Sequence, residues 1–573
     1  MQDLTPTHYD AHPCYPPRGG TVGKGWDAAV ASLPDGPAVL AVDGPAVLEW
    51  ARAVAALTRA LAGRGVYSEL FDVRDHFAGW EQVLSRTTSA ALADDPHFES
   101  LAQGTLADLF DELPGLRAPV DGITVVYGPG AALVEHDVLW YADLPKRYAE
   151  AAVIGRRAAN LAQPETEGPG TTKRLFYVDW PLLDRHRDAV AERIDLWLDT
   201  QDPAEPAVLD GATLRDTLAG LAGRPFRTRP TFNTTSWGGH WGQRELGFNP
   251  AATNTALGYE LIAPESGILI GAEDGPCVEI PFQLAVALHP REILGPPVHD
   301  VFGTSFPIRF DYLDTVDGGN LSVHCHPRSD YMRDVFGWPY TQHETYYMMV
   351  GGKDSDVFLG LRDGVDVDAF QRAAHDAAHH GQPFDITTHV QTFPATAHQL
   401  FLIPAGTPHG SGAGNVVLEV SATPYLYSLR FYDWLRRDAG GNQRPVHVDH
   451  AFRNLDTERT GKAVERDLVQ EPAPLRGGSG WSEETIGALP EMFFEVRRVV
   501  LDPGSVGEDD TEGRFHVLNV VEGDGVRIQP AGSPRDAHTL AYAETLVVPA
   551  SVGAYTLHPI GRNPVRIVKS LVR

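Results

Sequence analysis

A chain of 573 residues has room for roughly two to four domains, each with an apolar core. Its formal net charge of −29 argues against nucleic acid or an anionic membrane as a partner, because both carry the same sign of charge. Three widely spaced cysteines, Cys14, Cys277 and Cys325, do not form the pattern of a disulfide framework. The stretch MQDLTPTHYDAHPCYPP lacks a basic segment followed by an apolar one, and no apolar run reaches about 18 residues, so we expect a cytoplasmic protein.

Residues 1–230 are predicted to form an α/β domain. PAVLAVDG, VYSELFDV and GITVVYGPGAAL read as strands, and VLEWARAVAALTRALAGRG has helical spacing, which together indicate a parallel sheet. The loop after the first strand, residues 44–47, contains no GxxxxGK[ST], so it lacks the glycines and the lysine that hold a phosphate. The outline is similar to P-loop folds of the uridine-kinase and phosphoribulokinase class in a degenerate, non-catalytic form. Further along, RLFYVDW is expected to be a strand and PLLDRHRDAVAERIDLWLDT a helix.

From Thr231 onward, short β-runs are punctuated by glycine and proline. Trp237 stands at the entrance to this region, where its ring either stacks on a sugar or plugs a barrel end. Residues 365–386 are expected to be a helical insertion whose histidines lie on a solvated face. A proline-rich connector, residues 456–487, leads to strand-like runs in residues 488–573.

Four residues form the most informative pattern in the chain. His324 and His326 alternate on one predicted strand and therefore project to the same side, Glu344 opens the next apolar run, and His409 follows a Pro-Ala-Gly-Thr-Pro turn. Three imidazoles and one carboxylate suit a first-row divalent metal and leave positions for water or substrate. We expect one Zn²⁺ per chain, with iron, manganese or nickel as alternatives.

In chain order, these segments resemble the two cupin motifs, HxH…E(x)6G and PxGxxH, with Gly351 and Pro404 completing them. The long gap between His326 and Glu344 predicts an inserted excursion between two strands. The expected fold is thus α/β plus all-β: a P-loop-kinase-like sheet in residues 1–230, a metal-binding cupin barrel in residues 231–455, and a second, metal-free cupin-like barrel after the connector.

The stretch from Trp237 to Asp433 resembles the type I phosphomannose isomerases of the cupin superfamily, most of all a long bacterial class with an extra N-terminal α/β region. The pieces that carry the resemblance are WGG, FDYLD, NLSVHCHP, HETYYMM, FLIPAGTPHGSG, LEVSATPY and SLRFYDW. The resemblance implies a metal-dependent isomerase that interconverts mannose 6-phosphate and fructose 6-phosphate, or a related sugar, through a cis-enediolate. It does not imply an oligomeric state.

Carried over to this sequence, the resemblance makes His326, Glu344 and His409 zinc ligands and Arg430 an active-site arginine. His324 stands where the family has glutamine, which keeps a ligand but changes its type. Glu419 and Asp433 match acidic residues of the cleft and are the candidates for general base, although each could instead be the buried partner of a nearby arginine. The substrate-binding candidates are Trp237, Arg309, Asp311 and Glu260.

Asp311 stands where the family usually has a lysine, so a 6-phosphate would need Arg309 or another base. Two other functions stay open. Three histidines and a glutamate are also the ligand set of cupin dioxygenases and oxidases, for which zinc would be unsuitable because it has no redox chemistry. A non-catalytic sugar-phosphate sensor would bind sugar without turnover.

Overall fold

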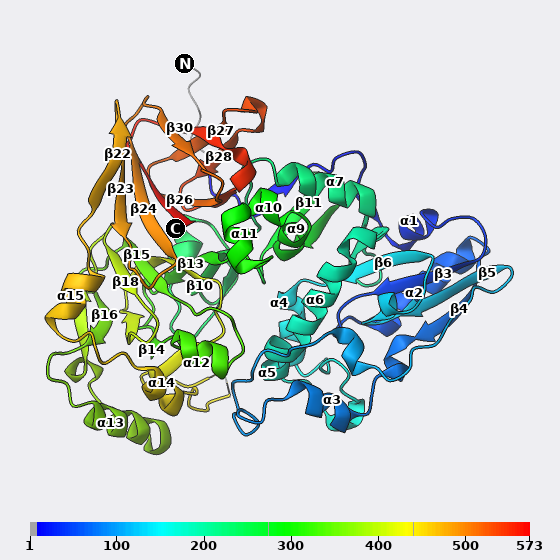
Figure 1. Ribbon diagram of the computed structural model, residues 1–573, viewed down its shortest axis with the longest axis horizontal. Coiled ribbons are helices and arrows are strands. Elements are labelled where there is room, and N and C mark those ends of the chain that lie inside the picture. The colour runs from blue at the N-terminus through cyan, green and yellow to red at the C-terminus, as the bar shows by residue number, and fades with distance from the viewer. Residues whose placement is uncertain (1–7, 273, 439) are drawn as a thin grey trace.

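The computed structural model describes residues 8–272, 274–438 and 440–573, which form three units (Figure 1). An α/β unit, blue to cyan, lies on the right of the view; a central β unit in green and yellow lies at the lower left, and a C-terminal β unit in orange and red lies above it. Residues 1–7, part of the predicted first domain and of the stretch read for targeting signals, lie outside the described residues. None of the described helices is long and apolar enough to cross a membrane.

The α/β unit is built on a seven-stranded sheet. Its order is β2 (Gly23–Lys24), β8 (Ala207–Asp210), β7 (Leu196–Asp199), β6 (Val138–Asp143), β3 (Ala38–Asp43), β5 (Gly122–Tyr127) and β4 (Tyr67–Asp72). Strands β3 to β7 are parallel, which confirms the predicted parallel sheet, whereas β8 is antiparallel to β7. After β3, the indole Nε1 of Trp50 donates to the carbonyl of Pro45 at 3.1 Å and closes the loop that lacks the phosphate-binding pattern.

Helices cover both faces of this sheet because its strands are apolar on both sides. Leu40 and Val42 pack into the core under α1 (Trp26–Ala31) and α2 (Trp50–Gly63). Val39 and Ala41 point the other way, into the core under α6 (Trp180–Val190) and α7 (Gly211–Leu221). The unit also contains α3 (Trp80–Thr87), α4 (Lys146–Ile154) and α5 (Thr172–Arg174).

Two predictions in this region are wrong. RLFYVDW is not a strand but a π-helical turn, Leu175–Asp179, that continues into α6. Its apolar run is buried on several sides, and periodicity cannot separate such a buried helix from a buried strand. The helix predicted to follow ends early, at Val190, and its last residues form strand β7.

The central unit consists of two antiparallel sheets. The β13 sheet has the order β18 (Leu400–Ile403), β15 (Glu344–Val350), β20 (Val416–Ala422), β13 (Ile308–Asp314), β10 (Leu257–Leu261) and β9 (Thr231–Asn233). The β14 sheet has the order β17 (Val390–Pro394), β16 (Asp356–Leu361), β19 (His409–Ser411), β14 (Val323–Cys325) and β21 (Leu429–Tyr432). The two predicted excursions are present: α12 (Ser329–Asp334) lies between β14 and β15, and α13 (Val367–His380) follows β16.

On α13, His375 is half-exposed and His379 and His380 are exposed, as expected for a solvated face. The remaining helices around the central unit are α8 (Trp241–Glu245), α9 (Phe282–Leu288), α10 (Pro290–Ile293), α11 (Pro296–Phe302), α14 (Val448–Asn454) and α15 (Lys462–Leu468).

A small sheet joins the start of the described chain to the central unit, in the order β1 (Cys14–Tyr15), β11 (Gly267–Gly271) and β12 (Cys277–Pro281). It brings the Sγ atoms of Cys14 and Cys277 to 3.3 Å from each other, a proximity that their spacing in the sequence does not indicate. Both are free thiols, as is Cys325.

The C-terminal unit also has two antiparallel sheets around one apolar core. One has the order β22 (Ala473–Gly478), β23 (Trp481–Gly487), β24 (Phe494–Leu501), β31 (Val565–Val572), β26 (His516–Glu522) and β29 (Thr545–Val548); the other has β25 (Gly507–Asp510), β30 (Ala554–Pro559), β27 (Gly525–Pro530) and β28 (His538–Ala541). The predicted connector is therefore wrong in its second half, because β22 and β23 pair with β24 as part of this unit.

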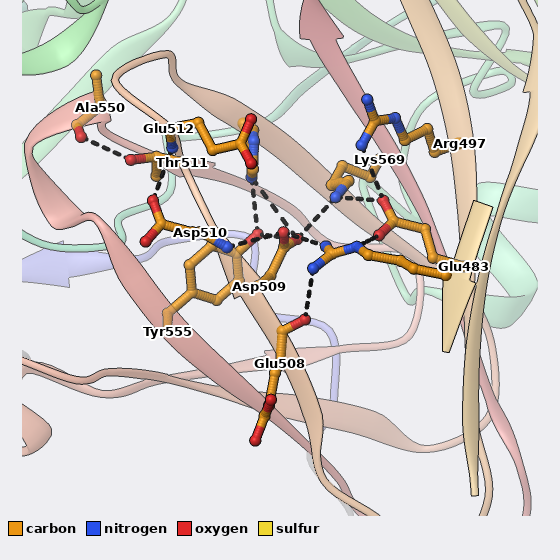
Figure 2. Close-up of polar contacts among 12 residues, drawn as sticks. Glu483, Arg497, Glu508, Asp509, Asp510, Thr511, Glu512, Ala550, Tyr555 and Lys569 are labelled. Carbon is orange, nitrogen blue, oxygen red and sulfur yellow. Dashed lines mark hydrogen bonds and ion pairs between the residues drawn. The ribbon is translucent and has the colours of Figure 1, made fainter. Parts of the chain in front are cut away.

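A buried ion-pair network lies inside the C-terminal unit (Figure 2). Lys569 is fully buried and contacts Glu483 and Asp509, with 2.7 Å between its Nζ and the Oδ2 of Asp509. The hydroxyl of Tyr555 donates to the same oxygen at 2.7 Å. A buried ammonium needs such partners to offset its desolvation, so the network fits a structural role within the unit.

Candidate metal centre

The four predicted ligands converge in the central unit, between its two sheets. His324, His326, Glu344 and His409 offer ligand atoms that all lie within 4.8 Å of one another. His324 is paired with His409 across strands β14 and β19, while Glu344 begins β15 in the opposite sheet. The Nε2 of His326 lies 2.5 Å and the Nε2 of His409 lies 3.4 Å from the same oxygen of Glu344.

Backbone carbonyls orient all three imidazoles. The Nδ1 of His324 donates to the carbonyl of Ser322 at 2.9 Å, that of His409 to Thr407 at 2.9 Å, and that of His326 to Tyr427 at 3.3 Å. Each of these bonds fixes the tautomer that leaves a lone pair on Nε2, as metal-binding histidines require. The turn before His409 depends on Gly406, whose φ of +90° is a conformation that side chains with a Cβ rarely adopt.

The donor set fits a divalent metal ion. The Nε2 of His409 and the Oε1 of Glu344 are buried without a hydrogen-bond partner, which is costly unless another group satisfies them. Burial and the neighbouring imidazoles hold the pKa of His324 well below its usual range, so it is neutral. Burial opposes ionisation of Glu344, yet positive charge on His409 and His326 holds the pKa of its carboxyl well below the usual range, and a bound cation would act in the same direction. Neutral imidazoles and an ionised carboxylate are the forms that bind metal.

A cavity of about 250 Å³ opens beside these ligands. Its lining includes Trp237, Arg309, Asp311, Glu419 and Arg430, which were all predicted as site residues. The β13 sheet supplies most of its polar wall, because alternate residues of each strand face the cavity.

The acidic groups of the wall share one arginine. Asp311 and Glu419 are register partners on β13 and β20, and Arg309 lies two residues before Asp311. The guanidinium of Arg309 donates to Glu419, and its Nε lies 3.2 Å from Asp311. Burial raises the pKa of Glu419 well above its usual range, and burial, with the charge of Glu344 nearby, raises that of Asp311 to about 7. The Oδ1 of Asp311 has no hydrogen-bond partner.

A second wall of the cavity is cationic. Arg430 pairs with His324 across strands β21 and β14, and Arg444 lies beside it. Burial first, and then the charge of Arg444, lower the pKa of Arg430 to about 10. An anionic group of a substrate nearby would favour its charged form.

Two predicted site residues lie elsewhere. Asp433 does not line the cavity; its carboxylate is 2.7 Å from Arg436 and 3.0 Å from Arg444, so it holds these arginines in place. Glu260 lies on β10 next to the cavity-lining Tyr259, and alternation along the strand turns it to the opposite face of the sheet. There its carboxylate accepts from the backbone N–H of Thr545 in the C-terminal unit at 2.9 Å.

Several cavity residues were not found from the sequence. They are Thr235, Leu257, Tyr259, Leu313, Leu321, Ser322, Gln342, Tyr346, Tyr425, Ser428 and Arg444. Parity along the strands could have indicated some of them: Gln342 and Tyr346 flank Glu344 at two-residue spacing, and the Nε2 of Gln342 donates to Glu344 at 3.3 Å. Arg444 lies in an irregular loop, for which no such periodicity exists.

The fold and this site together define a candidate metal centre in a two-sheet β unit, and comparisons with known proteins add relatives. Residues 25–223, nearly the whole α/β unit, match a family described as a domain of unknown function (DUF8485). The chain is 26% identical over 294 residues to the mannose-6-phosphate isomerase of Streptococcus mutans serotype c, which covers 50% of this chain and 82% of that protein. The chain is therefore homologous to mannose-6-phosphate isomerase, at modest identity, over half of its length.

Similar solved structures include the mannose 6-phosphate isomerase from Bacillus subtilis, with a TM-score of 0.49 and 18% identity over 61% of this chain and 99% of that one. A variant of the phosphomannose isomerase from Salmonella typhimurium has a TM-score of 0.47 and 15% identity over 61% of this chain and 99% of that one.

Proposed function

We propose that the chain is a metal-dependent aldose–ketose isomerase that interconverts mannose 6-phosphate and fructose 6-phosphate, or a related pair of sugar phosphates. The observation that carries the proposal is the convergence of the three-histidine, one-glutamate cluster and the Arg309–Asp311–Glu419 group on one cavity. Homology to mannose-6-phosphate isomerase supports the choice of reaction. The α/β unit would then be the extra region of a long form, and the C-terminal unit a second cupin-like barrel.

Aldose–ketose isomerisation moves a proton between C1 and C2 of the sugar, and negative charge develops on the neighbouring oxygens. A divalent ion held by His324, His326, Glu344 and His409 would supply stabilisation of that charge. Asp311 and Glu419 are placed to transfer the proton: both face the cavity, and Asp311 has an unpartnered oxygen there. Arg309, bonded to both acids, would fix their orientation and allow one proton to be shared between them.

The phosphate would bind to Arg430, with Arg444, which Asp433 holds at 3.0 Å, beside it. Arg309, one of the predicted alternatives to the missing lysine, is paired with Glu419 and Asp311, so two carboxylates already offset its charge. The guanidinium of Arg430, in contrast, donates only to the carbonyl of Pro445 among the described residues. A guanidinium without a carboxylate partner suits bidentate binding of a phosphate.

The test is an isomerase assay on zinc-loaded protein with mannose 6-phosphate and with free mannose. We expect turnover of the phosphate ester, its loss in His409→Ala, and incorporation of solvent deuterium at C2 or C1 that falls about 10²–10⁴-fold in Asp311→Asn if this acid carries the proton. Retention of full turnover by both Asp311→Asn and Glu419→Gln would contradict the assignment of these acids.

Lack of turnover with either sugar, while metal is still bound, would refute the isomerase. Because the ligand set by itself also fits an oxygen-activating cupin, oxygen consumption by iron-loaded protein would then identify a dioxygenase or oxidase. Tight binding of the sugar phosphate without turnover would instead identify a sensor.

A further inference from the structure

The segment Leu426–Arg430 connects the candidate metal centre to the α/β unit. On its inner side, the carbonyl of Tyr427 accepts the Nδ1 hydrogen bond of His326, and Arg430 lines the cavity. The orientation of one metal ligand and the position of one cationic wall residue therefore depend on where this segment lies. Its outer side packs against residues from the α/β unit.

Two aromatic residues of the α/β unit make the first contact. The hydroxyl of Tyr177 donates to the carbonyl of Leu426 at 3.1 Å, and its ring centroid lies 5.4 Å from that of Tyr427. The ring of Phe98 is stacked with that of Tyr427, with centroids 6.2 Å apart and an interplanar angle of 22°. All three side chains are buried, with exposed fractions of 3% for Phe98, 2% for Tyr177 and 0% for Tyr427.

A second contact reaches Arg430 through His447. The backbone N–H of His447 donates to the carbonyl of Arg430 at 2.8 Å, and the N–H of Arg430 donates back to the Nδ1 of His447 at 3.3 Å. Phe98 packs on His447 with ring centroids 4.7 Å apart. Asp95 contacts α14, the helix that begins directly after His447, because its Oδ2 is 2.7 Å from the Nε2 of His450.

These contacts come from the part of the chain that matches a domain of unknown function. Asp95, Phe98 and Tyr177 all lie within that part, residues 25–223. Phe98 and Tyr177 share one buried apolar cluster with Tyr427 of the segment, and close packing of this kind restricts the backbone.

We propose that the α/β unit is a positioning domain for the metal centre: Phe98 and Tyr177 fix the segment Leu426–Arg430, and through it the ring of His326 and the guanidinium of Arg430. For its kinetic consequences, this proposal rests on the proposed isomerase; for its effect on metal binding it does not. Phe98 and Tyr177 are positioning residues, since they touch neither the metal ligands nor the cavity.

The test uses the full-length chain with Co²⁺, whose visible absorption reports the geometry of its ligands. We expect Phe98→Ala and Tyr177→Leu to weaken Co²⁺ binding about 10-fold, the lower end for changes behind a metal ligand, and to alter the absorption bands. Tyr177→Phe, which removes only the hydrogen bond to Leu426, should give a smaller change in the same direction, and Phe98→Leu should restore part of the loss.

The matched control is Phe110→Ala. Phe110 is a buried phenylalanine of the same unit, 6% exposed, but it stacks on Phe77 with centroids 4.4 Å apart, and the structure gives it no contact with the segment. It should lower thermal stability as Phe98→Ala does and leave the Co²⁺ affinity and spectrum unchanged. Equal metal affinity and spectra in Phe98→Ala and the unaltered chain would overturn the proposal, as would equal losses in Phe98→Ala and Phe110→Ala.

The kinetic arm separates the two proposals. With mannose 6-phosphate, Phe98→Ala should lower kcat and raise KM, because both His326 and Arg430 lose support. If the unaltered chain binds Co²⁺ but does not turn over the sugar, the isomerase is refuted while the spectra still decide the positioning role. If the unaltered chain binds no Co²⁺, the positioning role is overturned as well.

Discussion

Each imidazole of the candidate metal centre donates a hydrogen bond from its Nδ1 to a backbone carbonyl, and this bond orients the ring. Because Nδ1 is engaged in every case, Nε2 is the atom left for an ion, and in His409 that atom has no partner. A buried acceptor without a partner costs about 1–3 kcal/mol, and a bound ion would remove that cost.

Replacing His409 by alanine should therefore weaken Zn²⁺ binding by more than the about 10–100-fold that changes behind a ligand cause. Isothermal titration with Zn²⁺, or measurement of the metal content after dialysis, checks this outcome. His379→Ala is the control, because His379 is exposed on α13 and should leave the metal content unchanged. Equal zinc content in the two variants would refute the assignment of His409 as a ligand.

At the cationic wall, Arg444→Gln should raise KM for mannose 6-phosphate about 10–100-fold, because one charge-assisted contact to the phosphate is worth roughly 1.5–3 kcal/mol. The KM for unphosphorylated mannose should not change. Steady-state kinetics with both sugars measures the difference, and Arg437→Gln, at an exposed arginine nearby, serves as control. A parallel rise in KM for both sugars would place Arg444 at the sugar ring instead of the phosphate.

The sequence predicts metal ligands better than the other site residues, for a physical reason. HxH on a strand and PxGxxH at a turn combine residue type with local geometry, so they identify His324 and His409 without knowledge of the fold. Acidic residues carry no such local signature: Glu260 and Asp311 lie on neighbouring strands, β10 and β13, but only Asp311 faces the cavity. Which residues of a strand face the cavity depends on how the strand pairs with its neighbours, and only the folded chain defines that pairing.

At the scale of elements, several parallel strands of the α/β sheet carry an acidic residue at their carboxyl ends. Strands β3, β6 and β7 each end in an aspartate, namely Asp43, Asp143 and Asp199, and all three are buried. Burial, with the charge of Asp199 nearby, raises the pKa of Asp143 to about 7. In the unfolded chain an aspartate titrates near pH 4.

Asp143 should therefore make the protein less stable as the pH rises. Below about pH 4, Asp143 is protonated in both the folded and the unfolded state and does not affect stability. Between about pH 4 and 7 the chain must take up a proton when it folds, so the free energy of unfolding falls as the pH rises. Asp143→Asn removes this dependence and should raise the free energy of unfolding at pH 8 by up to about 3–4 kcal/mol, with a smaller gain at pH 5.5.

Urea denaturation of both chains at pH 5.5 and pH 8 measures the effect. Asp121→Asn, at an exposed aspartate of the same unit, should change the free energy of unfolding by the same amount at both pH values, and by less than about 0.5 kcal/mol. A gain from Asp143→Asn that does not grow with pH would contradict the expected titration.

The elements that the sequence predicts well have a clear period or clear boundaries. Helix α2 shows three- and four-residue spacing, and the parallel strands of the first unit are short apolar runs that end in turn residues. RLFYVDW and the strands β22 and β23 lack these features, because the former is apolar on several sides and the latter lie among prolines and glycines. In these cases tertiary packing decides the structure, and local sequence does not encode it.

At the scale of the whole molecule, the three units meet at a buried arginine. Arg227 lies between the α/β and central units and is 2% exposed. Its Nη1 donates to Glu544 of the C-terminal unit at 2.5 Å and to the carbonyl of Asp10 at 2.9 Å, and its Nη2 lies 4.0 Å from Glu260 of the central unit. The misassigned Glu260 therefore has a structural place: it belongs to the junction of the units and not to the cavity.

Replacing Arg227 by methionine should lower the free energy of unfolding by about 3–5 kcal/mol, because it leaves Glu544 and Glu260 buried without their cation. Burial raises the pKa of Glu260 to about 7 even with Arg227 lowering it, so the loss should be larger at pH 8, where Glu260 is ionised beside Arg227, than at pH 6, where it is mostly protonated. Arg566→Met, which breaks an exposed pair with Glu522 at 2.9 Å, should cost less than about 1 kcal/mol at either pH. Urea denaturation followed by tryptophan fluorescence compares the two. If Arg227→Met cost no more than Arg566→Met, the ion pairs of Arg227 would not hold the units together, and the C-terminal unit would be retained on the central one by apolar contacts and by hydrogen bonds such as those from Tyr312 to Ala543 and from Thr545 to Glu260.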